Sequence, residues 1–168
     1  MSRTHSVIPS PIGPLTAVRE DGVLVALWMG SAPDPETLGP RDDAGFADVR
    51  EQLAQYFSGN RTSFDLALRA SGNPLQLAVW QLIAAIPYGA TRTYGELARD
   101  LGPHRLGQAP VAEIPGQAVG AACGRNPLPI VVPCHRVVGA DGSLVGFGGG
   151  LDRKRFLLDL EHRDERLF

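Results

Sequence analysis

Short apolar runs separated by turn residues characterise the first part of the chain. Apolar positions gather in three runs, at 6–8, 15–18 and 23–28, and stretches rich in glycine, proline or acidic residues divide them. Such runs are typical of strands joined by turns. After a loop from Gly30 to Arg41 the apolar positions recur every three or four residues, which predicts a helix. The residues expected on its apolar face are Phe46, Val49, Leu53 and Phe57.

The pattern becomes mainly helical after the first seventy residues. One last short strand is expected near Ser63 to Leu68, and Ala70 to Pro74 has the composition of a linker. The apolar stripe that follows predicts a helix, and its members are Leu75, Val79, Leu82, Ile83 and Ile86. The next helix has an explicit start, because Thr93 and Glu96 are spaced as a capping box. It is expected to end at Gly102.

Proline and glycine interrupt the remainder of the chain. A broken stretch over 103–115 precedes a short helix expected at about 116–123. The apolar segment 130–133 is interpreted as a buried extended run, and 136–138 as a short strand. A final helix follows a glycine cluster and runs through Glu161.

These patterns predict an α+β fold in two domains. A small N-terminal antiparallel sheet with a helix would occupy residues 1–70, and a mostly helical domain residues 74–168. Of the 168 residues, 43% are hydrophobic and 20% charged, as is typical of a soluble globular protein. The chain shows neither a signal peptide nor an apolar run long enough to cross a bilayer, so we expect it in the cytoplasm.

Cysteine usage and charge limit the possible functions. The two cysteines, Cys123 and Cys134, form no disulfide framework, which suits a reducing compartment. Together with the histidines they show no familiar metal-ligand spacing, so we expect neither a metal nor a cofactor. Residues 1–73 hold 6 basic and 9 acidic residues, a charge of −3, whereas residues 74–168 hold 10 and 9, a charge of +1. This weak asymmetry permits DNA binding without indicating it.

The strongest chemical signal is the tetrapeptide from Pro133 to Arg136, directly after the apolar run. A cysteine becomes a useful nucleophile as a thiolate, which requires a nearby base or positive charge. Neighbouring side chains on a strand point to opposite faces. Irregular backbone or a bridging water would therefore have to connect Cys134 to His135. The tetrapeptide leaves open a buried structural cysteine beside a surface histidine.

Glu161 favours the catalytic interpretation. It lies four residues after Leu157 and three after Leu158, which places it near the apolar face of the last helix. A carboxylate there is costly unless it is paired, and an imidazole is a suitable partner. Cys134, His135 and Glu161 would then act as nucleophile, base and orienting acid. A solvated glutamate at a helix end is the alternative.

These residues belong to a longer segment that resembles a known family signature. Residues 124–138, GRNPLPIVVPCHRVV, look like the signature of the O6-alkylguanine-DNA alkyltransferases, and Ser10 to Thr16 is similar to bacterial members. Further similar segments are 79–80, 86–89, 93–98, 118–120, 148–151 and 157–161. The resemblance extends over nearly the whole chain and implies a winged helix-turn-helix-like motif in the second domain.

The resemblance implies DNA repair by direct reversal. The alkyl group of O6-alkylguanine, with O4-alkylthymine as a second candidate substrate, would pass to Cys134 in one irreversible turnover. The damaged nucleotide must first be flipped out of the duplex. The partner would be double-stranded DNA, bound through its minor groove by a monomer.

Residue roles follow from the resemblance position by position. Cys134 matches the alkyl acceptor, His135 the base that acts through a water, and Glu161 the carboxylate that orients it. Tyr94 matches a hydrogen-bond donor to the flipped guanine, and Asn126 a residue that ties the helix-turn-helix to the active-site strand. DNA contacts are implied for Thr93, Gln117, Ala118, Gly120, Arg125 and Arg136. A base pocket is implied for Pro129, Val137, Gly148 and Gly149.

The chain departs from the family pattern at two places. Gln117 stands where members carry an arginine that fills the gap left by the flipped base, and a glutamine brings no cation. Residues 103–114 exceed the expected tight turn, so part of them must loop out. The run from Arg153 to Arg155 is interpreted as a solvated helix start that could also steer DNA. Cys123 is expected to pack in its short helix.

Two other functions remain open at this point. Alkyltransferase-like proteins bind lesions without chemistry, but they carry another residue, commonly tryptophan, where this chain has Cys134. An unrelated cysteine hydrolase would need repeated turnovers and an oxyanion hole, for which the sequence shows no candidate.

Overall fold

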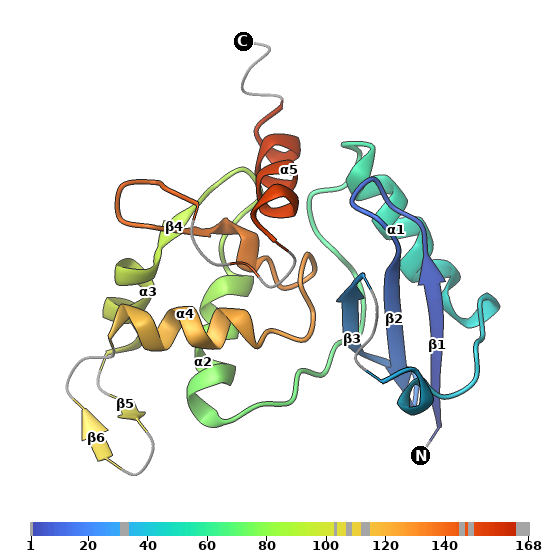
Figure 1. The fold of residues 1–168 in the computed structure, drawn as a ribbon, viewed down its shortest axis with the longest axis horizontal. Coiled ribbons are helices and arrows are strands. Elements are labelled where there is room, and N and C mark those ends of the chain that lie inside the picture. Colours follow the sequence, from blue (N-terminus) through green and yellow to red (C-terminus); the bar gives the residue numbers. More distant parts are fainter. Residues whose placement is uncertain are drawn as a thin grey trace. The chain divides into compact units, whose positions relative to one another are not determined.

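The computed structural model describes residues 2–30, 34–102, 104–106, 109–111, 115–144, 147 and 150–163. The chain divides into two compact units, Met1–Ser71 and Gly72–Phe168 (Figure 1). An antiparallel sheet with helices forms the first unit and helices dominate the second, which confirms the α+β fold class. Within the described residues, every helix is too short or too polar to cross a membrane. Gly148 and Gly149 lie outside the described residues.

A three-stranded antiparallel sheet forms the centre of the first unit. The strands lie in the order β1-β2-β3, and the register between β2 and β3 shifts at Val18 and Arg19. The elements are β1 (Arg3–Ile8), β2 (Leu15–Glu20), β3 (Val23–Met29), the 3-10 helices η1 (Pro35–Leu38) and η2 (Ala44–Phe46), and α1 (Ala47–Phe57). All three predicted strands are therefore present.

Two expectations for this unit need correction. The buried stripe of η2 and α1 ends on Tyr56, which is fully buried, rather than on Phe57, which is half-buried. The spacing of three, four and three residues from Phe46 leads to position 56, and Phe57 lies off that line. The strand expected near 63–68 is also absent from the described structure. The chain instead meets β3 at one bridge, where Leu24 exchanges backbone hydrogen bonds with Ala67 and Arg69.

Three helices in contact with one another form the body of the second unit, namely α2, α3 and α4 (Figure 1). The elements in chain order are α2 (Pro74–Ala84), β4 (Arg92–Thr93), α3 (Tyr94–Leu101), β5 (His104–Leu106), β6 (Ala109–Val111), α4 (Gly116–Gly124), the 3-10 turn η3 (Cys134–Arg136), β7 (Val137–Val138) and α5 (Leu151–Glu161). β4 and β7 pair in parallel. This pairing holds the start of α3 beside the segment that carries Cys134.

Capping residues set where these helices begin. The predicted capping box of α3 is confirmed, since Thr93 Oγ1 accepts from Glu96 N and Glu96 Oε1 accepts from Thr93 N, both at 3.1 Å. Gly102, with φ of 65°, ends the helix as predicted. A second capping box starts α2, between Asn73 and Gln76. Asn73 lies in the stretch expected to be a linker, and its spacing to Gln76 is that of a capping box.

The insertion between α3 and α4 forms a hairpin. β5 pairs with β6 in antiparallel fashion, from His104 opposite Val111 to Leu106 opposite Ala109. The two helices that flank it still contact each other. The extra residues therefore lengthen the connection of the helix pair without separating the helices.

Residues 130–133 are not extended, contrary to expectation. Ile130 has φ of 75° and lies in a turn, although it is buried. Asn126 accounts for this geometry: its Nδ2 donates to the carbonyl of Val132 at 2.8 Å, and its Oδ1 accepts from the N–H of Leu128 at 3.0 Å. These hydrogen bonds replace those that a strand would need. The strand β7 starts only at Val137, because Arg136 still belongs to η3.

Candidate active site

Cys134 lies at the start of η3 and is buried, with 6% of its surface exposed. Its backbone N–H donates to the carbonyl of Val132, so the turn held by Asn126 also sets the position of the sulfur. Burial raises the pKa of the Cys134 thiol, while a hydrogen bond with Asn126 and the charge of Lys154 oppose that rise. The cysteine needs a base to ionise it.

His135 and Glu161 form a buried pair beside this cysteine. Nε2 of His135 lies 2.6 Å from Oε2 of Glu161, and the exposures of the two residues are 0% and 3%. Burial by itself raises the pKa of Glu161, but hydrogen bonds from His135 and Arg136 outweigh it and lower the value to about 2. The carboxylate is therefore ionised and can only accept, so Nε2 of His135 is the donor.

The second ring nitrogen of His135 is then an acceptor. Burial, followed by the charges of Arg136 and Lys154, lowers the pKa of His135, and Glu161 only partly offsets this. The ring is neutral near pH 7, with Nδ1 unprotonated. Nδ1 is buried and has no hydrogen-bond partner among the residues that the structure describes. An unprotonated imidazole nitrogen can take up a proton, as a general base must.

Arg136, for which a DNA contact is expected, is not exposed in this structure. Its guanidinium is buried, with 6% of the residue exposed, and its Nε and Nη2 donate to the two oxygens of Glu161 at 2.8 and 3.0 Å. Nη1 donates to the carbonyl of Ile86 at 2.7 Å, and the group lies 5.7 Å from the ring centre of Tyr88. A buried carboxylate needs a positive partner, and Arg136 fills that need for Glu161.

Lys154 is a site residue that the sequence interpretation missed. Instead of a solvated charge, it is fully buried, and its Nζ donates to the carbonyl of Val137 at 2.6 Å. Burial lowers the pKa of Lys154, while the thiols of Cys134 and Cys123 act in the opposite direction. The signal was available, because Lys154 is three and four residues before Leu157 and Leu158, on the same helical face as Glu161.

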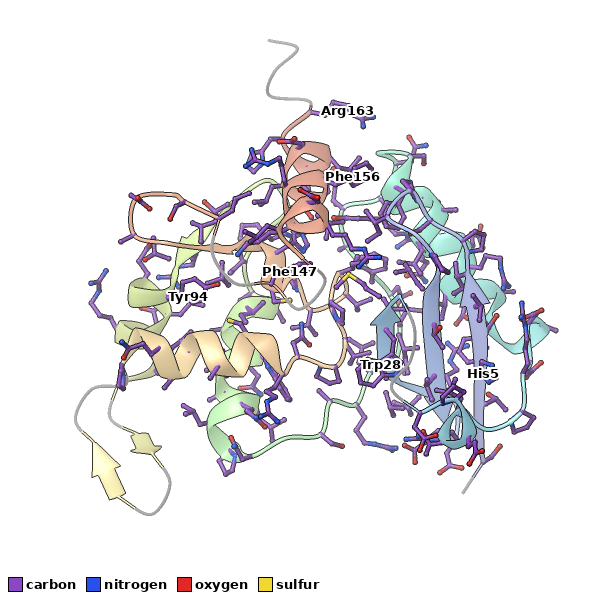
Figure 2. The ribbon with its side chains drawn as sticks, in the orientation of Figure 1. His5, Trp28, Tyr94, Phe147, Phe156 and Arg163 are labelled. Atoms are coloured by element: carbon purple, nitrogen blue, oxygen red, sulfur yellow. The ribbon has the colours of Figure 1, made fainter. Side chains whose placement is uncertain are left out.

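Tyr94 stands in the first turn of α3, next to α4 (Figure 2). The ring lies 5.8 Å from the Nζ of Lys154. A methyl group added at Gly120 of α4 would lie 3.8 Å from the ring, an ordinary van der Waals contact, so the ring packs against this part of α4. Burial and the nearby thiols of Cys123 and Cys134 raise the pKa of Tyr94 to about 12. Its hydroxyl therefore remains protonated and can donate.

The residues predicted to contact DNA and those predicted to border the base pocket differ in exposure. Gln117 near the start of α4 and Arg125 just after its end are exposed, while Ala118, Gly120 and Thr93 are half-buried. Pro129 and Val137 are buried. The structure brings Cys134, His135, Glu161, Tyr94 and Asn126 into one region of the second unit, whereas Gly148 and Gly149 lie outside the described residues.

Replacing Lys154 by methionine is expected to slow the reaction of Cys134 with iodoacetamide on the order of tenfold near pH 7. The reason is that loss of the nearby cation raises the pKa of the thiol, and each pKa unit is about tenfold in thiolate. Peptide mass mapping separates Cys134 from Cys123. Arg155→Met, an exposed neighbour on α5, is the control. Equal rates of Cys134 modification in the wild type, Lys154→Met and Arg155→Met would contradict an electrostatic role for Lys154.

Two family models match the chain. The DNA-binding domain of 6-O-methylguanine DNA methyltransferase matches residues 74–163. The ribonuclease-like domain of 6-O-methylguanine DNA methyltransferase matches residues 4–70. Together these matches cover most of both units.

Relatives and solved structures agree with the models. The chain is 47% identical over 161 residues to a methylated-DNA–protein-cysteine methyltransferase of Mycolicibacterium paratuberculosis, covering 95% of this chain and 92% of that one. The crystal structure of Mycobacterium tuberculosis O6-methylguanine methyltransferase is similar with a TM-score of 0.83 and 43% identity, over 96% and 94% of the two chains. The crystal structure of Mycobacterium tuberculosis OGT in complex with DNA is similar with a TM-score of 0.83 and 44% identity, over 95% and 93%. The chain belongs to the methylated-DNA–protein-cysteine methyltransferase family.

Proposed function

We propose that this chain repairs O6-alkylguanine in double-stranded DNA by moving the alkyl group to the sulfur of Cys134, once per chain. The observation that carries the proposal is the buried pair of His135 and Glu161, which leaves Nδ1 of His135 unprotonated, in the residue that follows the buried Cys134. Family membership supplies the reaction type. The buried thiol and the unprotonated ring nitrogen support Cys134 as the nucleophile and His135 as the base.

The proposed reaction follows from these groups. Nδ1 of His135 takes the thiol proton of Cys134 through a water, and the thiolate attacks the alkyl carbon. The new S–C bond forms as the C–O6 bond breaks, and the electron pair of that bond remains on the purine, which then takes up a proton. The hydroxyl of Tyr94 donates a hydrogen bond to the departing base, because its raised pKa of about 12 keeps it protonated. A thioether has no good leaving group, so the cysteine is not regenerated.

DNA would have to deliver a flipped nucleotide to the site. Cys134 is only 6% exposed, so a base stacked in a duplex could not reach its sulfur. We place the exposed Gln117 and Arg125 of the α4 region at the DNA backbone and minor groove, with Thr93, Ala118 and Gly120 close by. Pro129, Val137, Gly148 and Gly149 would border the base. The protein would act as a monomer in the cytoplasm, where thiols stay reduced.

Intact mass after incubation with a duplex that contains O6-methylguanine tests this proposal. One added methyl group, mapped to Cys134, is the expected result. Binding without a change of mass would point to a lesion-binding module instead. More demethylated DNA than protein would point to a hydrolase with repeated turnovers. Either of these outcomes overturns the proposal.

Replacing Gln117 by arginine is expected to tighten duplex binding roughly fivefold and to steepen the salt dependence by about one counterion. The exposed position near the start of α4 would then present a cation that the natural glutamine lacks. Fluorescence anisotropy at several salt concentrations measures both effects. Asn60→Arg, which adds the same charge at an exposed position of the first unit, is the control. Equal affinity and equal salt dependence for wild type and Gln117→Arg would refute the prediction.

A further inference from the structure

Arg136 forms a three-residue cluster with His135 and Glu161, in which both carboxylate oxygens of Glu161 have defined donors. Oε1 of Glu161 accepts from Nε of Arg136 at 2.8 Å. Oε2 accepts from both Nη2 of Arg136, at 3.0 Å, and Nε2 of His135, at 2.6 Å. The carboxylate is therefore shared between a permanent cation and the proposed base.

The rest of the guanidinium is held just as firmly. Nη1 donates to the backbone carbonyl of Ile86, and the ring of Tyr88 covers one face of the group. Because Ile86 follows α2 and Glu161 ends α5, the arginine connects two elements to η3. A lysine could not reproduce this fork, since it has one nitrogen and no planar set of donors.

We propose that Arg136 is a positioning residue for the alkyl transfer, which keeps the proton off Nδ1 of His135 by balancing the charge of Glu161. This inference rests on the proposed function in one respect, that His135 is the base for Cys134. The reacting atoms do not touch Arg136. It acts through Glu161 and His135.

Counting charges shows why the arginine matters. Among the described residues, three charged side chains act on the ring of His135: Glu161 and Lys154 from α5, and Arg136 from η3. With Arg136 present, the guanidinium balances the negative charge of the ionised Glu161. The pair of His135 and Glu161 then holds a single proton, on Nε2. Without it, the pair carries an uncompensated negative charge in a buried place, which favours uptake of a second proton.

That second proton would go to the histidine. Imidazole, with an ordinary pKa of 6.5, is a stronger base than a carboxylate, with an ordinary pKa of 4.5. Since Nε2 already carries a proton, the second proton binds at Nδ1. Nδ1 is then a donor, and it cannot accept the proton of the Cys134 thiol until the pH rises above the new pKa.

Substituting Arg136 with methionine is therefore expected to move the titration of the His135 ring to higher pH, as followed by ¹⁵N NMR of labelled histidine. The acidic limb of the pH–rate profile for methyl transfer should move with it. At pH values below the pKa of His135, each unit by which the limb moves slows methyl transfer about tenfold. The rate recovers at high pH. A merely structural role would lower the rate at all pH values and leave the limb in place.

The double variant Arg136→Met/Glu161→Gln provides a sharper test. It removes both charges, and the amide oxygen of glutamine can still accept from Nε2 of His135. The His135 titration and the acidic limb are expected to return toward those of the wild type, although two residues are now altered. Arg69→Met, an exposed arginine of the first unit, controls for the loss of one positive charge.

Two results would overturn the inference: a folded Arg136→Met protein whose His135 titrates as in the wild type, or a double variant that keeps the full displacement of the single one. If Arg136→Met does not fold, Glu161→Gln and the double variant make the same comparison. His135 must then titrate at higher pH in the double variant than in Glu161→Gln, because the double variant lacks the arginine charge. The NMR titration reads the effect of Arg136 even if no methyl group is transferred, so failure of this inference and failure of the proposed function are distinguishable.

Discussion

A chain with serine in place of Cys134 is expected to bind methylated DNA and leave the methyl group on the guanine. The serine hydroxyl is a far weaker acid than a thiol, and His135, with its lowered pKa, is too weak a base to ionise it. We expect the rate of transfer to fall by at least about 10⁴-fold, as when the nucleophile of other enzymes is removed. Intact mass after long incubation measures the loss.

Binding and chemistry must be measured separately for this variant. Fluorescence anisotropy with a duplex containing O6-methylguanine should give an affinity close to that of the wild type, since the buried sulfur contributes little surface. Cys123→Ser is the matched control, and one methyl group should still be added to Cys134. A methylated Cys134→Ser protein, or a Cys123→Ser protein that takes up none, would show that the wrong cysteine was assigned.

Removing Glu161 is expected to be the most damaging change to stability. Glu161→Ala leaves the guanidinium of Arg136 buried without its carboxylate and takes away the partner of His135 Nε2. Breaking a buried ion pair by deleting one partner costs about 3–5 kcal/mol of unfolding free energy. Urea unfolding measures the loss. Glu161→Gln, which keeps an acceptor for His135, should lose less, and equal stability of the alanine variant and the wild type would contradict the role of this carboxylate.

The same carboxylate makes stability depend on pH. The folded-state pKa of Glu161, about 2, lies below the ordinary value of 4.5. Its stabilising contribution is therefore fully present above pH 4.5 and is lost as the pH falls from there toward 2. A difference of this size corresponds to roughly 3 kcal/mol. Glu161→Gln cannot titrate and should lack this contribution.

A comparison of wild type and Glu161→Gln between pH 6 and pH 2 isolates the effect of Glu161 from the other carboxylates. Hydrogen bonds also lower the pKa of Asp43, Asp48, Glu96 and Asp141, so these groups weaken both proteins in acid. The gap in unfolding free energy between the two proteins should narrow as the pH falls. A constant gap would mean that Glu161 titrates normally in the folded chain.

Much of the local structure could be predicted because nearest neighbours in sequence decide it. The three strands of the first unit follow from apolar runs divided by turn residues. The start of α3 follows from Thr93 and Glu96, whose reciprocal hydrogen bonds join residues only three apart. The same rule would have found the start of α2 at Asn73 and Gln76. Prediction from an apolar run failed at Ile130, where hydrogen bonds of the Asn126 side chain set the backbone conformation.

The sequence alone determined which groups could perform the chemistry: a cysteine and a histidine after an apolar run, and a glutamate spaced onto the buried face of the last helix. Only the tertiary structure decided that Arg136 and Lys154 are buried in the site and not solvated on the surface. The physical reason is that a buried cation needs acceptors. For Arg136 these lie on Glu161 and Ile86, 25 and 50 positions away in the chain, and for Lys154 on Val137, 17 positions away. No local pattern of apolar and polar residues contains partners at such separations.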